Sequence, residues 1–320
     1  MSFSFNFEKS NESSEEDNKP NDMDVYNEVI SSNNSFLPPK RHSLEELIEF
    51  LPENISFDII EVDFREFLSY KALLPKRAIW DIQLQLMAHD YDTSEGELLF
   101  LKGSSDIIPS VYEVYYVEYL RKTPLKYSRV LELGCGSALP SVVLFIQTLL
   151  CSRDQAINFT LQDYNASVLK FLTMPNLFLA WAIVKNQEIA SMKEMNITNT
   201  VKEQFLSDLA EKNITIDFIS GGWCDKMNHL IIDKHDLILS SETIYSKQNL
   251  NTFINILAYN IENHKESNAL IAAKKTYFGL DVSIEDFIQK LKEFHLSYSY
   301  VYQSVNTGIV RVILNIQSLL

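Results

Sequence analysis

Residues 130–140 read Val-Leu-Glu-Leu-Gly-Cys-Gly-Ser-Ala-Leu-Pro, and this stretch decides the fold class. An apolar strand is predicted over Arg129–Leu133, followed by a turn that holds Gly134 and Gly136 and by a helix from Pro140. Glycines let a ligand approach the backbone closely, and the first N–H groups of a helix are free to bind it. The stretch therefore predicts a ligand-binding turn at the end of a strand, although an ordinary tight turn fits the same pattern.

The residues around this turn favour one class of ligand over another. A dinucleotide site has a third glycine three residues after the second, and this chain has Leu139 there. Glu132, shortly before the first glycine, adds a carboxylate where a phosphate would be repelled. The turn therefore favours a ligand that carries an ammonium or hydroxyl group.

An acidic residue follows the second predicted strand, which covers Ile157–Leu161. The carboxylate of Asp163 can accept hydrogen bonds from both hydroxyls of a ribose. It can also cap the helix that is predicted from Ala166. The distance from the glycine turn to Asp163 is the one expected for a ligand with a ribose, so the combination favours a nucleoside.

A glycine pair and a tryptophan follow the third predicted strand, Thr215–Ile219. Gly221, Gly222 and Trp223 lie at the same predicted edge of the sheet as the first turn. The indole ring can stack on an adenine base, and it can equally pack on the core.

From Ser128 onward, apolar strands alternate with amphipathic helices. Such alternation predicts an α/β fold, with helices on both faces of a mostly parallel sheet. The last two strands, expected over Ser297–Gln303 and Ile309–Ile316, are joined by a short turn around Gly308 and must be antiparallel. The expected architecture is a Rossmann-like, seven-strand sheet with an antiparallel terminal hairpin.

Composition narrows the class of partner. The 320 residues carry 28 basic and 43 acidic side chains, which gives a formal net charge of −15. This charge argues against direct binding of nucleic acid through its phosphates and favours a basic protein partner. The three cysteines form no CxxC pair, so we expect neither a disulfide framework nor a metal site.

The location of the protein is inferred from what the sequence lacks. The first residues do not read as a secretory signal, and no apolar run reaches the roughly 20 residues that span a bilayer. We expect a protein of the cytoplasm and nucleus without membrane contact. Its six histidines show no ligand spacing, and we expect them at the surface.

Together, these features resemble the seven-strand methyltransferases that depend on S-adenosyl-L-methionine. Three further stretches resemble the protein-histidine methyltransferases: QDYN at 162–165, SSETIY at 240–245 and AKKTYFG at 273–279. A fourth, RAIWDIQLQLMA at 77–88, is similar to the fungal members of that family. The resemblance covers residues 70–316. It implies transfer of a methyl group from S-adenosyl-L-methionine to a histidine of a large-subunit ribosomal protein, which is a basic protein substrate.

The resemblance also implies the residues of the site. The residues implied to bind the cofactor are Glu118, Glu132, Gly134, Gly136, Asp163, Asn165, Gly222, Trp223 and Ser240. Those implied to form the substrate pocket are Glu242, Thr243, Tyr245 and Tyr277. Glu118 stands in for a glutamate of the family, although the Gly-Gly and Trp that accompany it there are not present here. Glu242 can hold the far ring N–H of the target histidine or cap the helix that follows.

The resemblance, with the composition, divides the chain into three parts. Residues 1–40 hold eight acidic side chains against three lysines, and we expect a disordered acidic tail that docks on a basic partner or only keeps the protein soluble. Residues 41–127 are expected to be a helical and strand extension that forms part of the substrate and cofactor mouth. Residues 128–320 are the expected methyltransferase domain, in a protein that we expect to be a monomer.

A histidine acceptor asks little of the enzyme beyond orientation. An imidazole with its ordinary pKa of about 6.5 already offers a neutral lone pair at neutral pH, so a strong base is not needed. Two alternatives stay open. A protein-lysine methyltransferase would share the cofactor residues but would have to deprotonate its acceptor, whose ordinary pKa is about 10.4. A binding module could keep the fold without activity.

Overall fold

The computed structural model describes residues 36–63, 71–88, 127–151, 155–232, 234–244, 246–261, 267–276, 282–304 and 310–319. Residues 36–320 form one structural unit.

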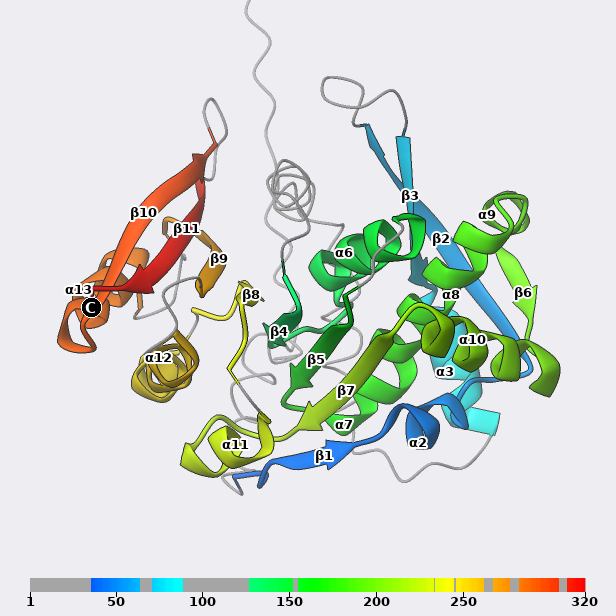
Figure 1. The fold of residues 1–320 in the computed structure, drawn as a ribbon, viewed down its shortest axis with the longest axis horizontal. Helices are drawn as coiled ribbons and strands as arrows, with labels where there is room; N and C mark the ends of the chain where they lie inside the picture. Colours follow the sequence, from blue (N-terminus) through cyan, green and yellow to red (C-terminus); the bar gives the residue numbers. More distant parts are fainter. Residues whose placement is uncertain are drawn as a thin grey trace, which may run out of the picture. The chain divides into compact units, whose positions relative to one another are not determined.

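The main sheet has the predicted parallel centre and antiparallel end. Its strands are β1 (Lys40–His42), β4 (Arg129–Leu133), β5 (Ile157–Asp163), β7 (Ile214–Ser220), β8 (Leu237–Ser241), β9 (Asn268–Lys274), β10 (Leu296–Gln303) and β11 (Arg311–Ser318). They lie in the order β1-β7-β5-β4-β8-β9-β11-β10 (Figure 1). The strands from β7 to β9 in this order are parallel to one another, and β11 is antiparallel to both β9 and β10. The predicted α/β sheet, mostly parallel with an antiparallel terminal hairpin, is therefore confirmed.

An eighth strand extends this sheet beyond the prediction. β1 pairs antiparallel with β7, with Lys40 opposite Ser220 and His42 opposite Phe218. β1 and β7 run side by side in Figure 1. The described fold thus begins inside the last residues that the sequence assigned to the tail.

A second, smaller sheet combines two strands of the N-terminal extension with one strand from the following part of the chain. It contains β2 (Asn54–Asp63), β3 (Lys71–Arg77) and β6 (Glu194–Asn196), in the order β3-β2-β6. Pro75 lies within β3, which is an edge strand among the described strands, and a proline is tolerated there because its missing N–H faces away from the sheet. β3 leads into helix α3 (Ile79–Ala88).

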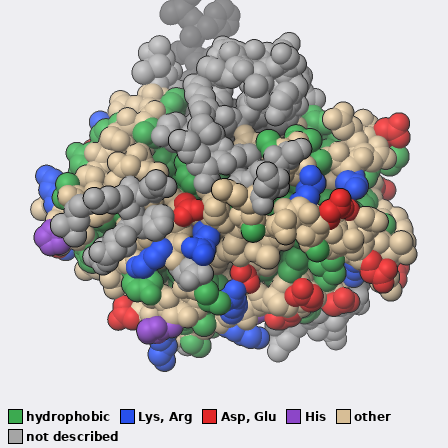
Figure 2. All heavy atoms as spheres, in the orientation of Figure 1, with side chains coloured by type: hydrophobic (Ala, Val, Ile, Leu, Met, Phe, Trp, Pro, Cys, Tyr) green, Lys and Arg blue, Asp and Glu red, His purple; other side chains and the backbone are tan. Residues whose placement is uncertain are grey.

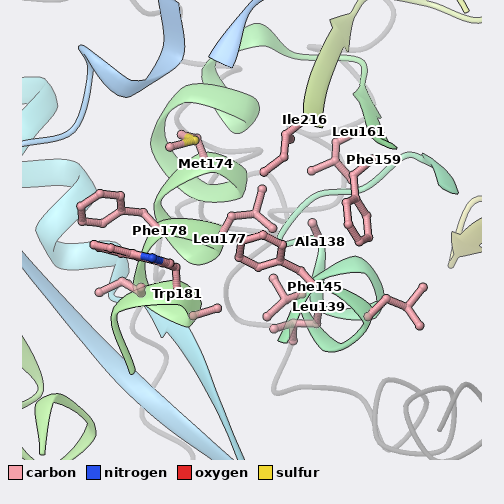
Figure 3. Packing of buried hydrophobic residues seen from close by; sticks show 14 of the residues in the cluster. Ala138, Leu139, Phe145, Phe159, Leu161, Met174, Leu177, Phe178, Trp181 and Ile216 are labelled. Carbon is pink, nitrogen blue, oxygen red and sulfur yellow. The ribbon is translucent and has the colours of Figure 1, made fainter. Parts of the chain in front are cut away.

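Helices cover both faces of the main sheet. On one face lie α6 (Leu139–Leu150), α8 (Met174–Lys185) and α10 (Asn199–Glu211); on the other lie α11 (Asp225–Leu230), α12 (Lys247–Ile261) and α13 (Ile284–Glu293). The alternation of β4 fits this division, because Val130 packs into the first core and Leu131 and Leu133 pack into the second. Figure 3 shows the first core, where Leu177 of α8 lies beside Phe145 of α6.

The helix predicted from Ala166 contains a π-helical segment. α7 (Ala166–Val168) passes into η1 (Leu169–Thr173) and then into α8, all within one continuous run. The expectation that no apolar run reaches the length of a membrane span is wrong for this run of 20 residues, which is long and apolar enough to cross a membrane, but 89% of its apolar window is buried inside the protein. Its apolar character is therefore accounted for by the core. Two short helices, α2 (Leu44–Ile48) and α9 (Ile189–Met192), complete the described elements.

The expectation that the histidines lie at the surface is wrong for two of them. His42 is 4% exposed and His235 is fully buried. Each finds hydrogen-bond partners that replace water, Ser220 and Glu46 for His42 and Asn260 and Thr160 for His235. His229 and His295 are exposed, and His89 and His264 lie outside the described residues.

Candidate functional site

The glycine turn after β4 is fixed to the end of β5 by three hydrogen bonds. The N–H of Gly134 donates to Oε1 of Gln162 at 3.1 Å, and that of Cys135 donates to the Gln162 carbonyl at 2.8 Å. The N–H of Gly136 donates to Oδ2 of Asp163 at 3.0 Å. The turn is therefore held in one conformation by the neighbouring strand.

The two glycines of the turn have different surroundings. Both have positive φ, +63° for Gly134 and +51° for Gly136, which glycine adopts without strain. A Cβ on Gly134 would lie 2.7 Å from Cγ2 of Thr243, whereas a Cβ on Gly136 would meet no heavy atom of the described chain within 4 Å. The turn is thus packed against β8 at Gly134 and open at Gly136, where a ligand has room to lie against the backbone.

Asp163 connects the glycine turn to the residue that precedes α7, and its role toward a ribose stays a prediction. Its Oδ1 accepts from the N–H of Asn165, the residue before α7, at 3.0 Å, while its Oδ2 holds Gly136. The side chain is 4% exposed, and this burial raises the pKa of the carboxyl to about 6, against the lowering effect of the backbone N–H groups. Asp163 and Asn165 both lie beside the open glycine, in the predicted position for a nucleoside.

Glu132 lies behind the turn and is 2% exposed. Its Oε2 accepts from the N–H of Ser141 at 3.0 Å and makes a short hydrogen bond with the Ser141 hydroxyl, so it binds the first turn of α6. The role of Glu132 toward the cationic end of a ligand stays a prediction. Burial, with the nearby charges of Asp163 and Glu132, raises the pKa of the Cys135 thiol, which keeps that thiol protonated and unreactive.

Gln162 joins the ends of three strands, and sequence reasoning did not include it in the site. Its Oε1 accepts from Nε1 of Trp223 at 2.8 Å as well as from Gly134, and its Nε2 donates to the carbonyl of Gly221 at 2.9 Å. The signal was available, because a glutamine at the end of a buried strand must find internal partners. The ring centroid of Trp223 lies 4.9 Å from that of Phe253, so the indole packs against the second core. Stacking of this indole on an adenine stays a prediction.

A second group that the sequence did not reveal lies on the π-helical run. Thr173 donates its hydroxyl hydrogen to the carbonyl of Gly136 at 2.6 Å, and Nδ2 of Asn176 donates to the carbonyl of Ser137 at 2.8 Å. Oδ1 of Asn176 accepts from the N–H of Arg77 at 2.8 Å. Since π-helical turns are common at functional sites, the brace of η1 and α8 under the glycine turn fits a binding role.

The end of β8 holds two of the residues predicted for the acceptor side of the site. The Ser240 hydroxyl donates to the carbonyl of Leu133 at 2.8 Å and lies 2.8 Å from the hydroxyl of Thr243. Glu242 has φ of +57°, an unusual value for a residue with a side chain. Its Oε2 lies 3.2 Å from Nζ of Lys274 at the end of β9, and its N–H donates to the carbonyl of Ala272. The pair therefore links the ends of β8 and β9.

Most of the predicted residues come together at one edge of the sheet. Those gathered at the carboxyl ends of β4, β5, β7 and β8 are Glu132, Gly134, Gly136, Asp163, Asn165, Gly222, Trp223, Ser240, Glu242 and Thr243. Glu118, Tyr245 and Tyr277 lie outside the described residues, and their roles stay predictions. No group of three or more His, Cys, Asp or Glu within the described ranges could hold a metal ion.

Comparisons with known proteins agree with the resemblance drawn from the sequence. No family model matches the chain. The chain is 31% identical over 271 residues to histidine protein methyltransferase 1 of Schizosaccharomyces pombe, with 78% of this chain and 76% of the relative covered. It is 32% identical over 305 residues to histidine protein methyltransferase 1 of Saccharomyces cerevisiae, with 81% of each covered.

Solved structures that resemble the fold are more distant. A mitomycin 7-O-methyltransferase aligns with a TM-score of 0.41 and 12% identity, over 75% of this chain and 60% of that one.

A more distant sequence relative, histidine protein methyltransferase 1 homolog of rat, is 26% identical over 66% of this chain and 58% of its own length. On the strength of the two fungal relatives, the chain belongs to the histidine protein methyltransferases, the S-adenosyl-L-methionine-dependent enzyme family that its motifs indicate.

Proposed function

We propose that this enzyme methylates a histidine side chain of a large-subunit ribosomal protein. The observation that carries the proposal is the open backbone at Gly136 beside the buried carboxylate of Asp163, in a chain of this family. The resemblance of residues 240–245 and 273–279 to members that act on such a protein supports the choice of substrate.

The residues around Gly136 fit a nucleoside cofactor. Adding a Cβ at this glycine would meet nothing within 4 Å, so the ligand can approach the N–H and carbonyl groups of the turn. The carboxylate of Asp163 would accept hydrogen bonds from the ribose hydroxyls, with Asn165 beside it. S-adenosyl-L-methionine, when bound, supplies a methyl group activated on a sulfonium.

The acceptor side would act mainly by orientation. A neutral imidazole has a lone pair on one ring nitrogen and a hydrogen on the other. The carboxylate of Glu242, held by Lys274, would accept the hydrogen bond from the far ring N–H and so aim the lone pair at the methyl group. Thr243, against Gly134, would set the distance between the acceptor and cofactor sides.

The charge of the chain supports a basic substrate. The net charge of −15 attracts a basic protein over a range set by the ionic strength. On the face seen in Figure 2, acidic and basic side chains are interspersed among the described residues. We include in the proposal that the enzyme works as a monomer in the cytoplasm and nucleus, without membrane contact or direct nucleic-acid binding.

The test is methylation of purified ribosomal proteins by the recombinant enzyme, with the modified residue identified by tandem mass spectrometry. We expect methyl groups on a histidine of one large-subunit protein, and none with an Asp163→Ala variant. Methyl groups on lysine and none on histidine would instead favour a lysine methyltransferase. No transfer, together with no affinity for S-adenosyl-L-methionine in calorimetry, would favour a binding module.

A further inference from the structure

A segment of the chain that precedes β1 lies on the two glycines at the end of β7. The N–H of Gly222 donates to the carbonyl of Leu37 at 2.9 Å. A Cβ on Gly222 would lie 2.6 Å from Cε2 of Phe36, and a Cβ on Gly221 would lie 2.6 Å from Cα of Pro39. Both glycines are therefore required for this segment to come as close as it does.

The segment is anchored by β1, so its position does not depend on Phe36 alone. The register places Lys40 opposite Ser220 and His42 opposite Phe218. His42 is buried, and its Nε2 lies 2.8 Å from the hydroxyl of Ser220. Arg41 makes an ion pair with Asp217 at 2.7 Å. These contacts hold the backbone from Phe36 to His42 against β7.

The anchored segment lies next to the predicted nucleoside site. The N–H of Gly221 donates to the carbonyl of Asp163 at 3.1 Å and to that of Tyr164 at 3.0 Å. The ring of Phe36 lies against Gly222, and Phe36 is 55% exposed. A large apolar ring is thus presented to solvent on a fixed backbone, beside the strand end where the ribose carboxylate is found.

We infer that Phe36 contacts the adenine of bound S-adenosyl-L-methionine, on a backbone that β1 holds in place beside the cofactor site. An aromatic ring is suited to this role because every base has a flat π-face that stacks on it. The inference rests on the cofactor edge assigned above. It gives a binding role to Phe36, which the sequence had grouped with the acidic tail.

The experiment measures affinity of the full chain for S-adenosyl-L-homocysteine, the methyl-free product, by isothermal titration calorimetry. For Phe36→Ala we expect the dissociation constant to rise about tenfold, the size of one lost stacking contact. Phe36→Tyr keeps the ring and is expected to bind within about twofold of wild type. Leu37→Ala is the matched control, because it removes a neighbouring apolar side chain and keeps the carbonyl that binds Gly222.

A double-mutant cycle tests the contact with Gly222 separately. The Cβ of Gly222→Ala would displace the Phe36 ring, so this change should weaken binding less in the Phe36→Ala background than in wild type. Thermal unfolding of each unliganded variant reports any loss of fold. Equal affinity of Phe36→Ala and wild type, or equal losses for Phe36→Ala and Leu37→Ala, would overturn the inference. Because this assay needs no protein substrate, its result is independent of whether a ribosomal protein is the methyl acceptor.

Discussion

The predicted cofactor side and the predicted acceptor side of the site are held in different ways. On the cofactor side, the turn at Gly134 and Gly136 has glycines where φ is positive, and its N–H groups are bound by Gln162 and Asp163. On the acceptor side, a residue with a side chain, Glu242, takes a positive φ. The two glycines are unstrained and internally bonded, and on this side a positive φ falls on a residue with a side chain only after the turn, at Ala138 (+54°), whereas on the acceptor side it falls on the predicted pocket residue itself.

This difference indicates where stability has been exchanged for function. A non-glycine residue in the left-handed region costs roughly 1–2 kcal/mol, and it persists where the surroundings hold it in place. Here the N–H bond to Ala272 and the ion pair with Lys274 hold Glu242. The cofactor side should therefore respond to substitution with loss of both binding and stability, and the acceptor side with loss of activity alone.

The largest effect is expected where the two sides touch. Gly134→Ala would add a Cβ 2.7 Å from Cγ2 of Thr243 at a φ of +63°. Strain and overpacking together should lower the free energy of unfolding by roughly 2–5 kcal/mol, measured by urea unfolding. Adding Thr243→Ser removes Cγ2 and should recover part of the loss; no recovery would show that the clash is not with Thr243.

Gly136→Ala is the matched control for that change. Its φ of +51° gives a similar backbone cost, but the new Cβ meets no described atom within 4 Å. The unfolding free energy should therefore fall by only about 1–2 kcal/mol. The affinity of the folded protein for S-adenosyl-L-homocysteine should fall as well, and by more than this loss of stability accounts for. Equal affinity to wild type would contradict the assignment of the open side of the turn to the cofactor.

Asp163→Ala should give the next largest effect. It removes the acceptor of the ribose hydroxyls and leaves the N–H groups of Gly136 and Asn165 without their carboxylate. We expect affinity for S-adenosyl-L-homocysteine to fall by about a hundredfold, and unfolding free energy by about 1–3 kcal/mol. Calorimetry and urea unfolding of one preparation measure both; unchanged affinity would remove Asp163 from the site.

The pH dependence of binding should be smaller and should have a definite sign. The pKa of Asp163 is raised to about 6, so its carboxyl becomes protonated as pH falls through that value. Since the ionised form accepts the ribose hydroxyls, binding should weaken by up to about tenfold per pH unit below pH 6 and level off above it. Calorimetry between about pH 5 and pH 8 measures this, and Asp163→Asn should abolish the step.

The smallest effect is the most specific to the acceptor side. Glu242→Gly relieves the positive φ and should raise the unfolding free energy by about 1 kcal/mol, while methyl transfer falls and cofactor affinity stays the same. Lys274→Met, which removes the ion pair, should lower transfer in the same way without the gain in stability. If the Glu242→Gly enzyme kept full activity, Glu242 would not serve methyl transfer, and the difference drawn between the two sides would be wrong.

The sequence could predict those features that depend on local patterns. The strand and glycine turn at 129–136, the acid at 163 and the terminal hairpin each have a signature within a short stretch. Parallel strands bring their carboxyl ends to one edge, so the meeting of Gly136 and Asp163 followed from topology.

Features set by long-range contacts could not be predicted in this way. Residues 40–42 form a strand only because β7 offers an edge, and their polar, basic composition gives no strand signal. β3 contains Pro75 and was not predicted, since a proline argues against a strand unless the edge position is known. The brace of Thr173 on the glycine turn needs η1, whose π-helical form has no pattern in the sequence.

The pairing of β1 with β7 also affects how the protein can be handled. Without β1, the outer side of β7 would present a row of unused backbone donors and acceptors, which in other sheets promotes joining between molecules. A fragment trimmed to begin after residue 42 would uncover that row. Such a truncated form should self-associate during purification, and shortening from this end is best stopped before Phe36.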